Sequence, residues 1–269
     1  METVISGGNI VKAVILAGGL GTRMREETEF RPKPMVEVGG KPILWHLMKI
    51  YAQQGVTDFV ILTGYKGEMI KRFFFDYSML NLDFTINIGD KSSVEFFGSH
   101  DEDGWRVTVI DTGELSLTGE RLLRARQHIG HESFFLTYGD GLANVNLRAL
   151  SEVHSRSGAT LSISTSKPRS RFGVVAMAEN GLVDSFLEKP EGEEQVNIGF
   201  MLAEPEIFNY LVPGGSLEQE PLMEIARDKK LAAYHHTGFW QPMDTVRELE
   251  ILTRHWNSEP VPWQVIHNK

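Results

Sequence analysis

The sequence predicts an α/β fold, in which a mostly parallel sheet is flanked by helices. Several short apolar segments, such as 11–17, 59–63 and 133–138, show no alternation of apolar and polar residues. Such runs are typical of strands that are buried on both faces, as the strands of a parallel sheet are. The segments between them have the spacing of helices, and glycines follow the ends of the strands. Strands and helices in alternation indicate right-handed βαβ units.

The first half of the chain shows this alternation most clearly. Val11–Ala17 is predicted as a buried strand that ends at a pair of glycines. A helix is predicted over 42–54, because Pro42 fits a first turn, apolar residues recur with helical spacing, and Gly55 is a typical helix end. The next predicted elements are a strand over 59–63, a helix over 66–77, and strands over 83–88 and 105–111, with an acidic excursion from Gly98 to Gly104 between them.

The second half combines helices with shorter strands. Helices are predicted over 119–128, 146–157, 204–211, 219–229 and 244–256. Strands are predicted over 133–138, 159–165, 173–177, 182–187, 196–203 and 231–236. No proline- or serine-rich linker, repeat or low-complexity segment divides the chain. We therefore predict a single domain over 11–269 after an N-terminal extension over 1–10, built on a Rossmann-like mixed, mostly parallel sheet with small extra β elements.

Composition and charge exclude several classes of function. The 269 residues include no cysteine, which excludes disulfides, thiolate catalysis and Cys-ligated zinc or iron–sulfur sites. The formal charge of −9 disfavours a nucleic-acid partner, although a local basic cleft can hold a small polyanion. No apolar run approaches the ~20 residues that cross a bilayer, and the first residues lack the pattern of a signal peptide. We therefore expect no membrane partner and, by default, a cytoplasmic protein.

Two glycine-containing loops, 18–23 and 139–141, follow predicted strands. Ligands of open α/β sheets bind at the carboxyl ends of the strands, so both loops are candidate binding sites. The first loop is not a dinucleotide fingerprint, because Met24 stands where a third glycine or alanine is needed. Gly40-Lys41 is not a P-loop, since Pro42 follows in place of serine or threonine. Neither standard phosphate motif is therefore present.

The loop over 18–23 nevertheless has the composition of a phosphate site. Its glycines allow the backbone to approach an anion closely and to point N–H groups at it. Thr22 adds a hydroxyl donor, and Arg23 adds a planar guanidinium suited to bidentate phosphate binding. Lys33 lies further on between two prolines that restrict its backbone. A tight turn with solvated basic residues is the alternative, and the combination of Arg23 with Lys33 favours the phosphate site.

The combination of Gly18–Arg23 with Pro32–Pro34 resembles the sugar-1-phosphate nucleotidylyltransferases. That family shares an N-terminal Gly-Gly-x-Gly-Thr-Arg segment followed by Pro-Lys-Pro, and the likeness extends from Val11 to about Trp263. Further segments, above all Gly238–Thr245, most resemble the glucose-1-phosphate cytidylyltransferase branch. The resemblance implies the nucleotide-diphospho-sugar transferase type of fold.

The resemblance also implies a reaction. CTP and a sugar 1-phosphate, in the first place α-D-glucose 1-phosphate, would give a CDP-sugar and pyrophosphate by in-line attack on the α-phosphorus, with Mg²⁺ as cofactor. Such transfer depends on positioning and charge neutralisation. Asp140 and Asp244 match the family's Mg²⁺ ligands, and carboxylates suit a hard, octahedral cation. Taken alone, Asp140 is interpreted equally well as a turn residue, and Asp244 better as a helix N-cap.

The same resemblance implies roles for the other site residues. As catalytic residues, Arg23 would bind the β- and γ-phosphates, Lys33 the α-phosphate and the incoming phosphate, and Lys189 the sugar phosphate. Arg121 matches a residue that helps to recognise cytosine, with an exposed helix arginine as the alternative. Residues implied to bind the nucleotide are Leu16, Ala17, Gly18, Gly19, Gly21, Thr22, Arg121 and Gly139. Residues implied to bind the sugar phosphate are Glu188, Lys189 and Asn197, with a surface ion pair of Glu188 and Lys189 as the alternative.

The sequence leaves the substrate open. Ile198 stands where the glucose-specific enzymes have glycine, and residues 88–104 also differ, so another acceptor phosphate, or UTP or dTTP as donor, is an alternative. A regulatory subunit that binds nucleotide without catalysis is a different class. It is disfavoured because binding alone would not require all of Arg23, Lys33, Asp140, Lys189 and Asp244. The resemblance further implies a homo-oligomer, with a hexamer as one candidate and 88–104 as a contact segment.

Overall fold

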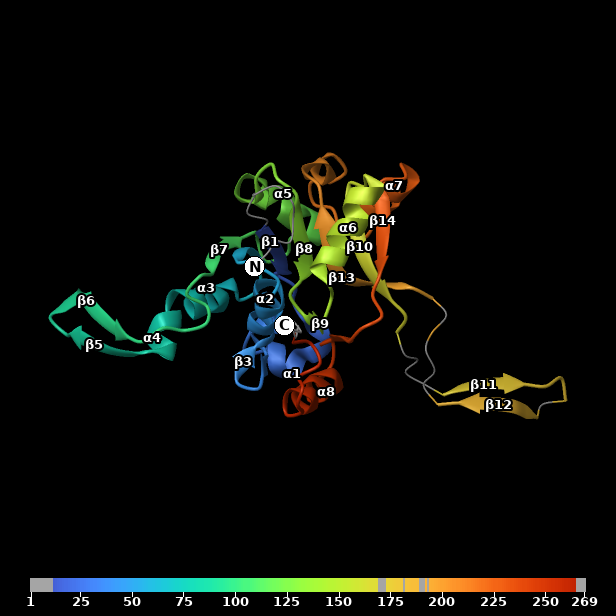
Figure 1. Ribbon diagram of the computed structural model, residues 1–269, viewed down its shortest axis with the longest axis horizontal. Helices are drawn as coiled ribbons and strands as arrows, with labels where there is room; N and C mark the ends of the chain where they lie inside the picture. The colour runs from blue at the N-terminus through green and yellow to red at the C-terminus, as the bar shows by residue number, and fades with distance from the viewer. Residues whose placement is uncertain (1–11, 169–172, 181, 189–191, 193, 265–269) are drawn as a thin grey trace.

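A seven-stranded sheet forms the centre of the described part of the chain (Figure 1). The computed structural model describes residues 12–168, 173–180, 182–188, 192 and 194–264. The strands of this sheet are β1 (Lys12–Ala17), β4 (Asp58–Thr63), β7 (Arg106–Asp111), β8 (Phe134–Tyr138), β10 (Leu161–Ser166), β13 (Val196–Ala203) and β14 (Leu231–His235). They lie in the order β14-β10-β13-β8-β1-β4-β7, and β13 alone among these described strands runs antiparallel to its neighbours. The predicted mixed, mostly parallel sheet is confirmed.

Helices cover both faces of the sheet. They are α1 (Arg25–Thr28), α2 (Ile43–Ala52), α3 (Gly67–Phe75), α4 (Tyr77–Asn81), α5 (Thr118–Ile129), α6 (Leu147–Ser157), α7 (Glu220–Arg227) and α8 (Val246–Trp256), with 3-10 turns η1 (Thr22–Met24), η2 (Lys33–Met35) and η3 (Pro205–Asn209). Ala13 and Ile15 of β1 pack in the core cluster that contains α2 residues, whereas Val14 and Leu16 pack with α5. Both faces of β1 are therefore buried, which is why its sequence shows no alternation. Of the helices that the structure describes, none is both long enough and apolar enough to cross a bilayer.

Pairs of shorter strands lie outside the main sheet, as the predicted small β elements. These pairs are β2 (Glu37–Val38) with β3 (Lys41–Pro42), β5 (Asp83–Asn87) with β6 (Asp90–Phe97), β9 (Gly141–Ala143) with β15 (Trp240–Pro242), and β11 (Val174–Met177) with β12 (Val183–Leu187). The β9–β15 pair joins two segments that are far apart in the sequence, and it carries part of the site described below.

The structure corrects several boundaries of the sequence analysis. The helix predicted over 66–77 is interrupted at Asp76, and α4 continues beyond it. Residues 90–97 were not expected to form a strand, but they pair with β5 as β6. The helix predicted over 204–211 is the shorter 3-10 turn η3. The described side chains of β6 are exposed or half-buried and impose no apolar pattern, so only the pairing with β5 reveals the strand. The predicted extension 1–10 and Val11 lie outside the described residues.

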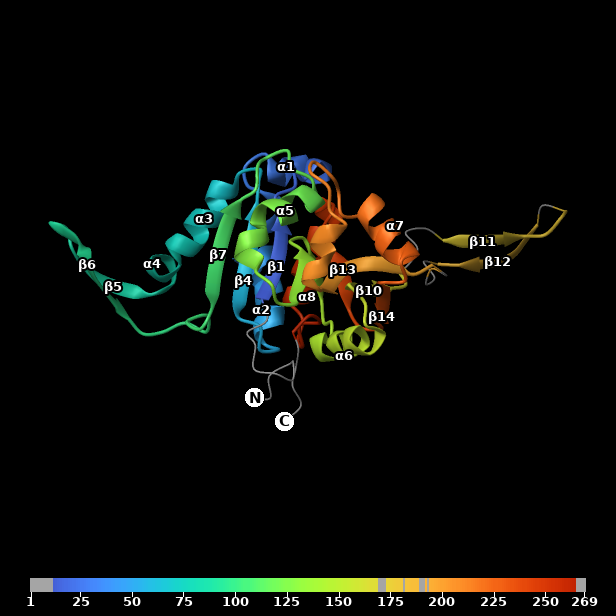
Figure 2. The ribbon, with the colours of Figure 1, turned by 90° about the horizontal axis from the view of Figure 1, so that it is seen from above.

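Two hairpins project from opposite ends of the main sheet (Figures 1 and 2). The β5–β6 hairpin extends beyond the end that carries β7, and the β11–β12 hairpin extends from the other end. Both hairpins expose large apolar side chains, namely Phe84, Ile88, Phe96 and Phe97 on the first and Val174, Val175, Met177, Leu182, Val183, Phe186 and Leu187 on the second. A two-stranded sheet without a partner is marginally stable in water, so these apolar faces need a cover.

Candidate active site

A cavity of about 210 Å³ opens at the carboxyl ends of β1 and β8. The two strands end side by side, because they pair in parallel with Leu16 opposite Tyr138. Open α/β sheets bind ligands at this edge. The lining residues are Leu16, Ala17, Gly19, Gly21, Thr22, Arg23, Lys33, Pro34, Gly139, Asp140 and Asp244. All of these except Pro34 are site residues predicted from the sequence.

Four charged side chains meet at this cavity. The ammonium of Lys33 donates to Asp140 Oδ2 at 2.7 Å and to Asp244 Oδ1 at 2.6 Å. Arg23 Nη1 lies 2.9 Å from Asp244 Oδ2. The side chain of Lys33 is 11% exposed, whereas that of Arg23 is 70% exposed. A buried ammonium therefore joins two aspartates that are distant in the sequence, and an accessible guanidinium stands beside them.

The charges in this cluster stabilise one another. Burial opposes the charged form of Lys33, but Asp140 and Asp244 outweigh it and raise the pKa of the ammonium. Burial also opposes ionisation of Asp244, but the hydrogen bond and charge of Lys33, together with Arg23, hold the pKa of that carboxyl below its usual value. Lys33 and Asp244 are therefore charged around neutral pH, as the binding of phosphates and of a metal ion requires.

Local backbone geometry positions the lysine and the glycine loop. Lys33 begins the 3-10 turn η2 between Pro32, whose backbone is extended, and Pro34. Gly21 has φ 62°, a conformation that favours glycine. A Cβ at Gly21 would also lie 2.6 Å from Thr28 Cγ2, so no other residue fits without displacement. Prolines thus restrain the backbone on both sides of Lys33, and the conformation of the loop favours glycine at position 21.

The pairing of β9 with β15 brings Asp140 and Asp244 together. Gly141 lies opposite Pro242 in this pair. The backbone N–H of Met243 then donates to the carbonyl of Asp140 at 2.8 Å. The segment before Asp244 is therefore fixed to the segment that contains Asp140, although about a hundred residues separate them in the sequence.

A cap at the start of α8 orients Asp244. Thr245, not Asp244, is the N-cap, and its side chain accepts from the backbone N–H of Glu248 at 3.3 Å. In return, Glu248 Oε2 accepts from the backbone N–H of Asp244 at 2.7 Å. This variant of a capping box leaves the Asp244 carboxylate directed at Lys33. The interpretation of Asp244 as an N-cap is thus wrong, and the Thr-x-x-Glu pattern is a signal that could have shown it.

Arg121 does not line the cavity but contacts the loop beside it. The residue is 4% exposed, and its guanidinium donates at 2.8–3.2 Å to the carbonyls of Gly18, Thr63, Gly113 and Glu114 and to the hydroxyl of Thr112. These groups follow β1, β4 and β7, so one side chain ties three strand ends together. A Cβ at Gly18 would lie 2.2 Å from the guanidinium, which explains the glycine there. The alternative of an exposed arginine is wrong, and the role of Arg121 in cytosine recognition stays a prediction.

Of the residues predicted to bind the sugar phosphate, the described ones, Glu188 and Asn197, do not line this cavity. Glu188 is exposed at the end of β12, and Lys189 lies outside the described residues. Asn197 Oδ1, on β13, accepts from the backbone N–H of Gly199 at 2.9 Å. Among the described residues, those that line the cavity include neither Glu188 nor Asn197. The sugar-binding roles of these residues therefore stay predictions.

Ile198 lies in the core and does not line the cavity. It is 5% exposed and belongs to the same core cluster as Tyr51 and Phe200. The departure from glycine at this position is therefore accommodated by packing against the face that α2 covers.

Tyr138 and Glu218 form a polar pair that the sequence analysis missed. The hydroxyl of Tyr138 donates to Glu218 Oε1 at 2.6 Å. Burial and the charge of Glu218 raise the pKa of Tyr138, so the hydroxyl keeps its proton. Gly199, at φ 84°, makes room for this ring, since a Cβ there would lie 2.4 Å from Tyr138 Cδ2. The pair stabilises β8 directly before Gly139 and Asp140, and no local pattern signals it because its partners are distant in the sequence.

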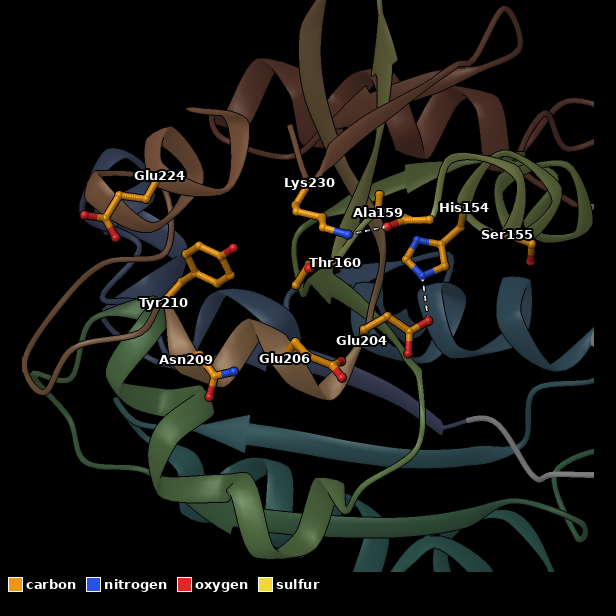
Figure 3. A pocket seen from close by; sticks show the side chains of 11 residues that line it. His154, Ser155, Ala159, Thr160, Glu204, Glu206, Asn209, Tyr210, Glu224 and Lys230 are labelled. Atoms are coloured by element: carbon orange, nitrogen blue, oxygen red, sulfur yellow. Dashed lines mark hydrogen bonds and ion pairs between the residues drawn. The ribbon is translucent and has the colours of Figure 1, made fainter. Parts of the chain in front are cut away.

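A second cavity, of about 770 Å³, lies near the amino end of β10 (Figure 3). His154 and Glu204 line it, with His154 Nε2 2.8 Å from Glu204 Oε1, and His154 Nδ1 is 2.8 Å from the Oγ of Ser162, which does not line the cavity. A serine, a histidine and a carboxylate in contact are the components of a hydrolase triad. Ser162 is fully buried, however, so a substrate cannot reach its hydroxyl. The hydrogen bonds of this cavity are therefore structural.

Comparison with known proteins finds relatives over most of the chain. Residues 12–241 match the family described as "Nucleotidyl transferase". The chain is 43% identical over 257 residues to a Bacillus subtilis (strain 168) protein named "Probable glucose-1-phosphate cytidylyltransferase", across 95% of this chain and 100% of that protein. It is also 43% identical to the glucose-1-phosphate cytidylyltransferase of Salmonella typhi, across 94% of this chain and 99% of that protein. UTP-bound UGPase from Acinetobacter baumannii has the same fold, with a TM-score of 0.67 at 18% identity over 94% of this chain and 96% of that one.

Proposed function

The chain belongs to the nucleotidyl transferase family, and we propose that it transfers the cytidylyl group of CTP to a sugar 1-phosphate, giving a CDP-sugar and pyrophosphate. The proposed acceptor is α-D-glucose 1-phosphate, in line with the names of the relatives at 43% identity. The observation that carries the proposal is the buried Lys33 between Asp140 and Asp244, next to the glycine loop. Cations and carboxylates at the mouth of an α/β sheet suit a polyphosphate that binds with a metal ion.

In this proposal the protein contributes position and charge. Backbone N–H groups of the loop that contains Gly19 and Gly21 would bind phosphate oxygens. The exposed guanidinium of Arg23 would bind the β- and γ-phosphates, and Lys33 would bind the α-phosphate. An oxygen of the sugar phosphate then forms a bond to the α-phosphorus while the bond to the leaving pyrophosphate breaks in line. Neutralising the phosphate charges allows the anionic acceptor to approach.

Asp140 and Asp244 would hold Mg²⁺ in the proposed complex. Their oxygens converge on one cation position, since both accept from the same ammonium of Lys33 at 2.7 and 2.6 Å. The described residues contain no group of three or more acidic or histidine side chains arranged to hold a metal, so water and phosphate oxygens would complete the coordination. When bound, the ion would neutralise negative charge on the phosphates of the nucleotide.

Other residues would recognise the base and the sugar. Arg121 would assist recognition of the base through the loop that begins at Gly18, whose carbonyl accepts from its guanidinium, and Glu188, Lys189 and Asn197 would bind the sugar phosphate. A different acceptor, or UTP or dTTP as donor, remains the nearest alternative. A regulatory subunit that only binds nucleotide is the alternative of a different class.

The experiment that tests the function is pyrophosphate release with Mg²⁺ over a matrix of donors and acceptors. CTP, UTP, dTTP, ATP and GTP would each be combined with several hexose 1-phosphates. We expect the highest kcat/KM for CTP with glucose 1-phosphate. A maximum with another acceptor would correct the sugar, and a maximum with another donor would correct the base. No release in any combination, with CTP binding intact, would favour the regulatory alternative.

We further propose that the chain forms a homo-oligomer through its projecting hairpins. Their apolar side chains are strongly exposed, with Ile88 84% and Met177 69% exposed. The hairpins lie at opposite ends of the sheet, so they do not cover each other within one chain (Figure 2). A second copy is therefore the proposed cover, by a head-to-tail contact that closes into a ring.

Sedimentation of the full chain tests the proposed assembly. We expect a species larger than the 30.3 kDa monomer at micromolar concentration. Replacing Val183 and Phe186 by serine should shift the population towards smaller species, because both side chains are exposed on β12. Met223→Ser, which removes an exposed apolar side chain from α7, is the matched control and should leave the assembly unchanged. A monomeric wild type would contradict the proposal.

A further inference from the structure

We propose that Lys33 is a resident cation that a divalent metal ion must displace, so that the metal ion enters the site together with the nucleotide. The inference rests on the proposed function, since it takes Asp140 and Asp244 as the metal ligands. It adds an order of binding that the proposed reaction alone does not require. The contacts of the Lys33 side chain support the inference.

Lys33 occupies the oxygens that a metal ion would need. Its ammonium contacts Asp140 Oδ2 at 2.7 Å and Asp244 Oδ1 at 2.6 Å, so one atom lies within hydrogen-bond distance of both carboxylates. The side chains of Asp140 and Asp244 are 38% and 21% exposed, and a metal ion can therefore reach them from solvent. A metal ion cannot bind between these two carboxylates while the ammonium stays where it is. The two cations would overlap and repel each other.

Charge balance favours the ammonium when no nucleotide is bound. Lys33 and Arg23 carry two positive charges, which match the two negative charges of Asp140 and Asp244. A divalent ion added to this balanced group leaves a surplus of positive charge in a partly buried site. A nucleoside triphosphate removes that surplus, because its phosphates are anionic and offer new acceptors to Lys33 and Arg23.

The structure also limits how Lys33 can leave. Pro32 and Pro34 restrain the backbone on both sides, so the side chain must move and the main chain need not. The lysine stem has four rotatable carbon–carbon bonds, which allow its ammonium to swing from the aspartates to a phosphate within the same cavity. Lys33 thus has two alternative partners, the aspartate pair in the free protein and the α-phosphate in the complex.

Binding of Mn²⁺ to the nucleotide-free full-length protein tests this inference. Mn²⁺ replaces Mg²⁺ as the probe, because its free concentration can be followed by electron paramagnetic resonance. We expect Lys33→Met and Lys33→Gln to bind Mn²⁺ at least about tenfold more tightly than the wild type, because the competing charge is gone. Lys33→Arg keeps the charge and should not gain affinity. Lys12→Met removes a lysine whose ammonium donates to the backbone carbonyls of His128 and Ile129, and it is the matched control without effect.

A double variant locates the bound ion. Adding Asp140→Asn to Lys33→Met should abolish the gain in Mn²⁺ affinity. Equal affinities of the wild type and both neutral variants would overturn the inference, and so would a gain that survives in the double variant. Circular dichroism and thermal unfolding establish that each variant is folded, and Lys33→Gln, whose amide can still donate to one aspartate, serves if Lys33→Met unfolds. Because no turnover is measured, a silent substrate matrix would overturn the proposed function without deciding this result.

Discussion

Asp140→Asn is expected to lower the turnover of cytidylyl transfer by about 10²-fold or more, a size typical of losing one electrostatic contact in the transition state. Asparagine keeps the size of the side chain and can still accept from Lys33, whose Nζ lies 2.7 Å from Asp140 Oδ2. It lacks the negative charge that a metal ion and the ammonium both require. The measurement is the initial rate of pyrophosphate release at saturating CTP, glucose 1-phosphate and Mg²⁺.

Asp228→Asn is the matched control for this prediction. It makes the same chemical change at an exposed aspartate that accepts from the Tyr210 hydroxyl at 3.0 Å and does not line the cavity between Lys33 and the glycine loop. Its turnover should equal that of the wild type. Wild-type turnover of Asp140→Asn at saturating Mg²⁺ would remove Asp140 from the metal site and leave the pair with Lys33 as a structural contact.

Arg121→Met should have the largest effect on stability, about 3 kcal/mol or more in the free energy of unfolding. The guanidinium donates to four backbone carbonyls and one hydroxyl at the ends of β1, β4 and β7. Without it, buried carbonyls lose their partners, and each such loss costs about 1–3 kcal/mol. The loop that begins at Gly18 should also lose its position, so the KM for CTP should rise. Equilibrium unfolding in urea and the kinetic assay measure the two effects.

Arg126→Met, on the same helix α5, separates the buried guanidinium from a general effect of the residue type. Arg126 is exposed, and its guanidinium lies 5.1 Å from the centre of the Phe208 ring. The loss of this contact should cost about 1 kcal/mol or less. Equal stability of the two variants would show that the strand ends do not depend on Arg121.

Much of the fold was predictable, because the burial of a strand determines which residue types occur in a short, continuous segment of the sequence. The apolar runs of β1, β4 and β8 lie between two layers of helices and therefore lack alternation. Pro42 and Gly55 likewise predicted the extent of α2 to within a few residues. Strand β6 escaped prediction because it pairs with β5 outside the main sheet and none of its described side chains is buried.

The residues of the site were predictable from the sequence, but several of the contacts between side chains were not. The glycine loop with Arg23 and Lys33, together with the family resemblance, identified ten of the eleven residues that line the cavity. The capping box of Thr245 and Glu248 has a local signature, and it could have been found. The pair of Tyr138 and Glu218 has none, since each residue is an ordinary polar side chain until the fold brings the two to 2.6 Å.

The sequence by itself determined the sheet, the glycine loop and the charged residues that follow its strands, because strand burial and backbone restraint depend on near neighbours. Only the tertiary structure decided that Lys33 lies between Asp140 and Asp244, and that Arg121 is buried beneath the loop. Both arrangements join segments that are distant in the sequence. The contacts that stabilise them exist only after the sheet has formed. A helix arginine has the same local pattern whether its guanidinium faces water or carbonyls. The guanidinium of Arg121 faces carbonyls because α5 packs beside the ends of β1 and β4, where Gly18 and Thr63 offer acceptors.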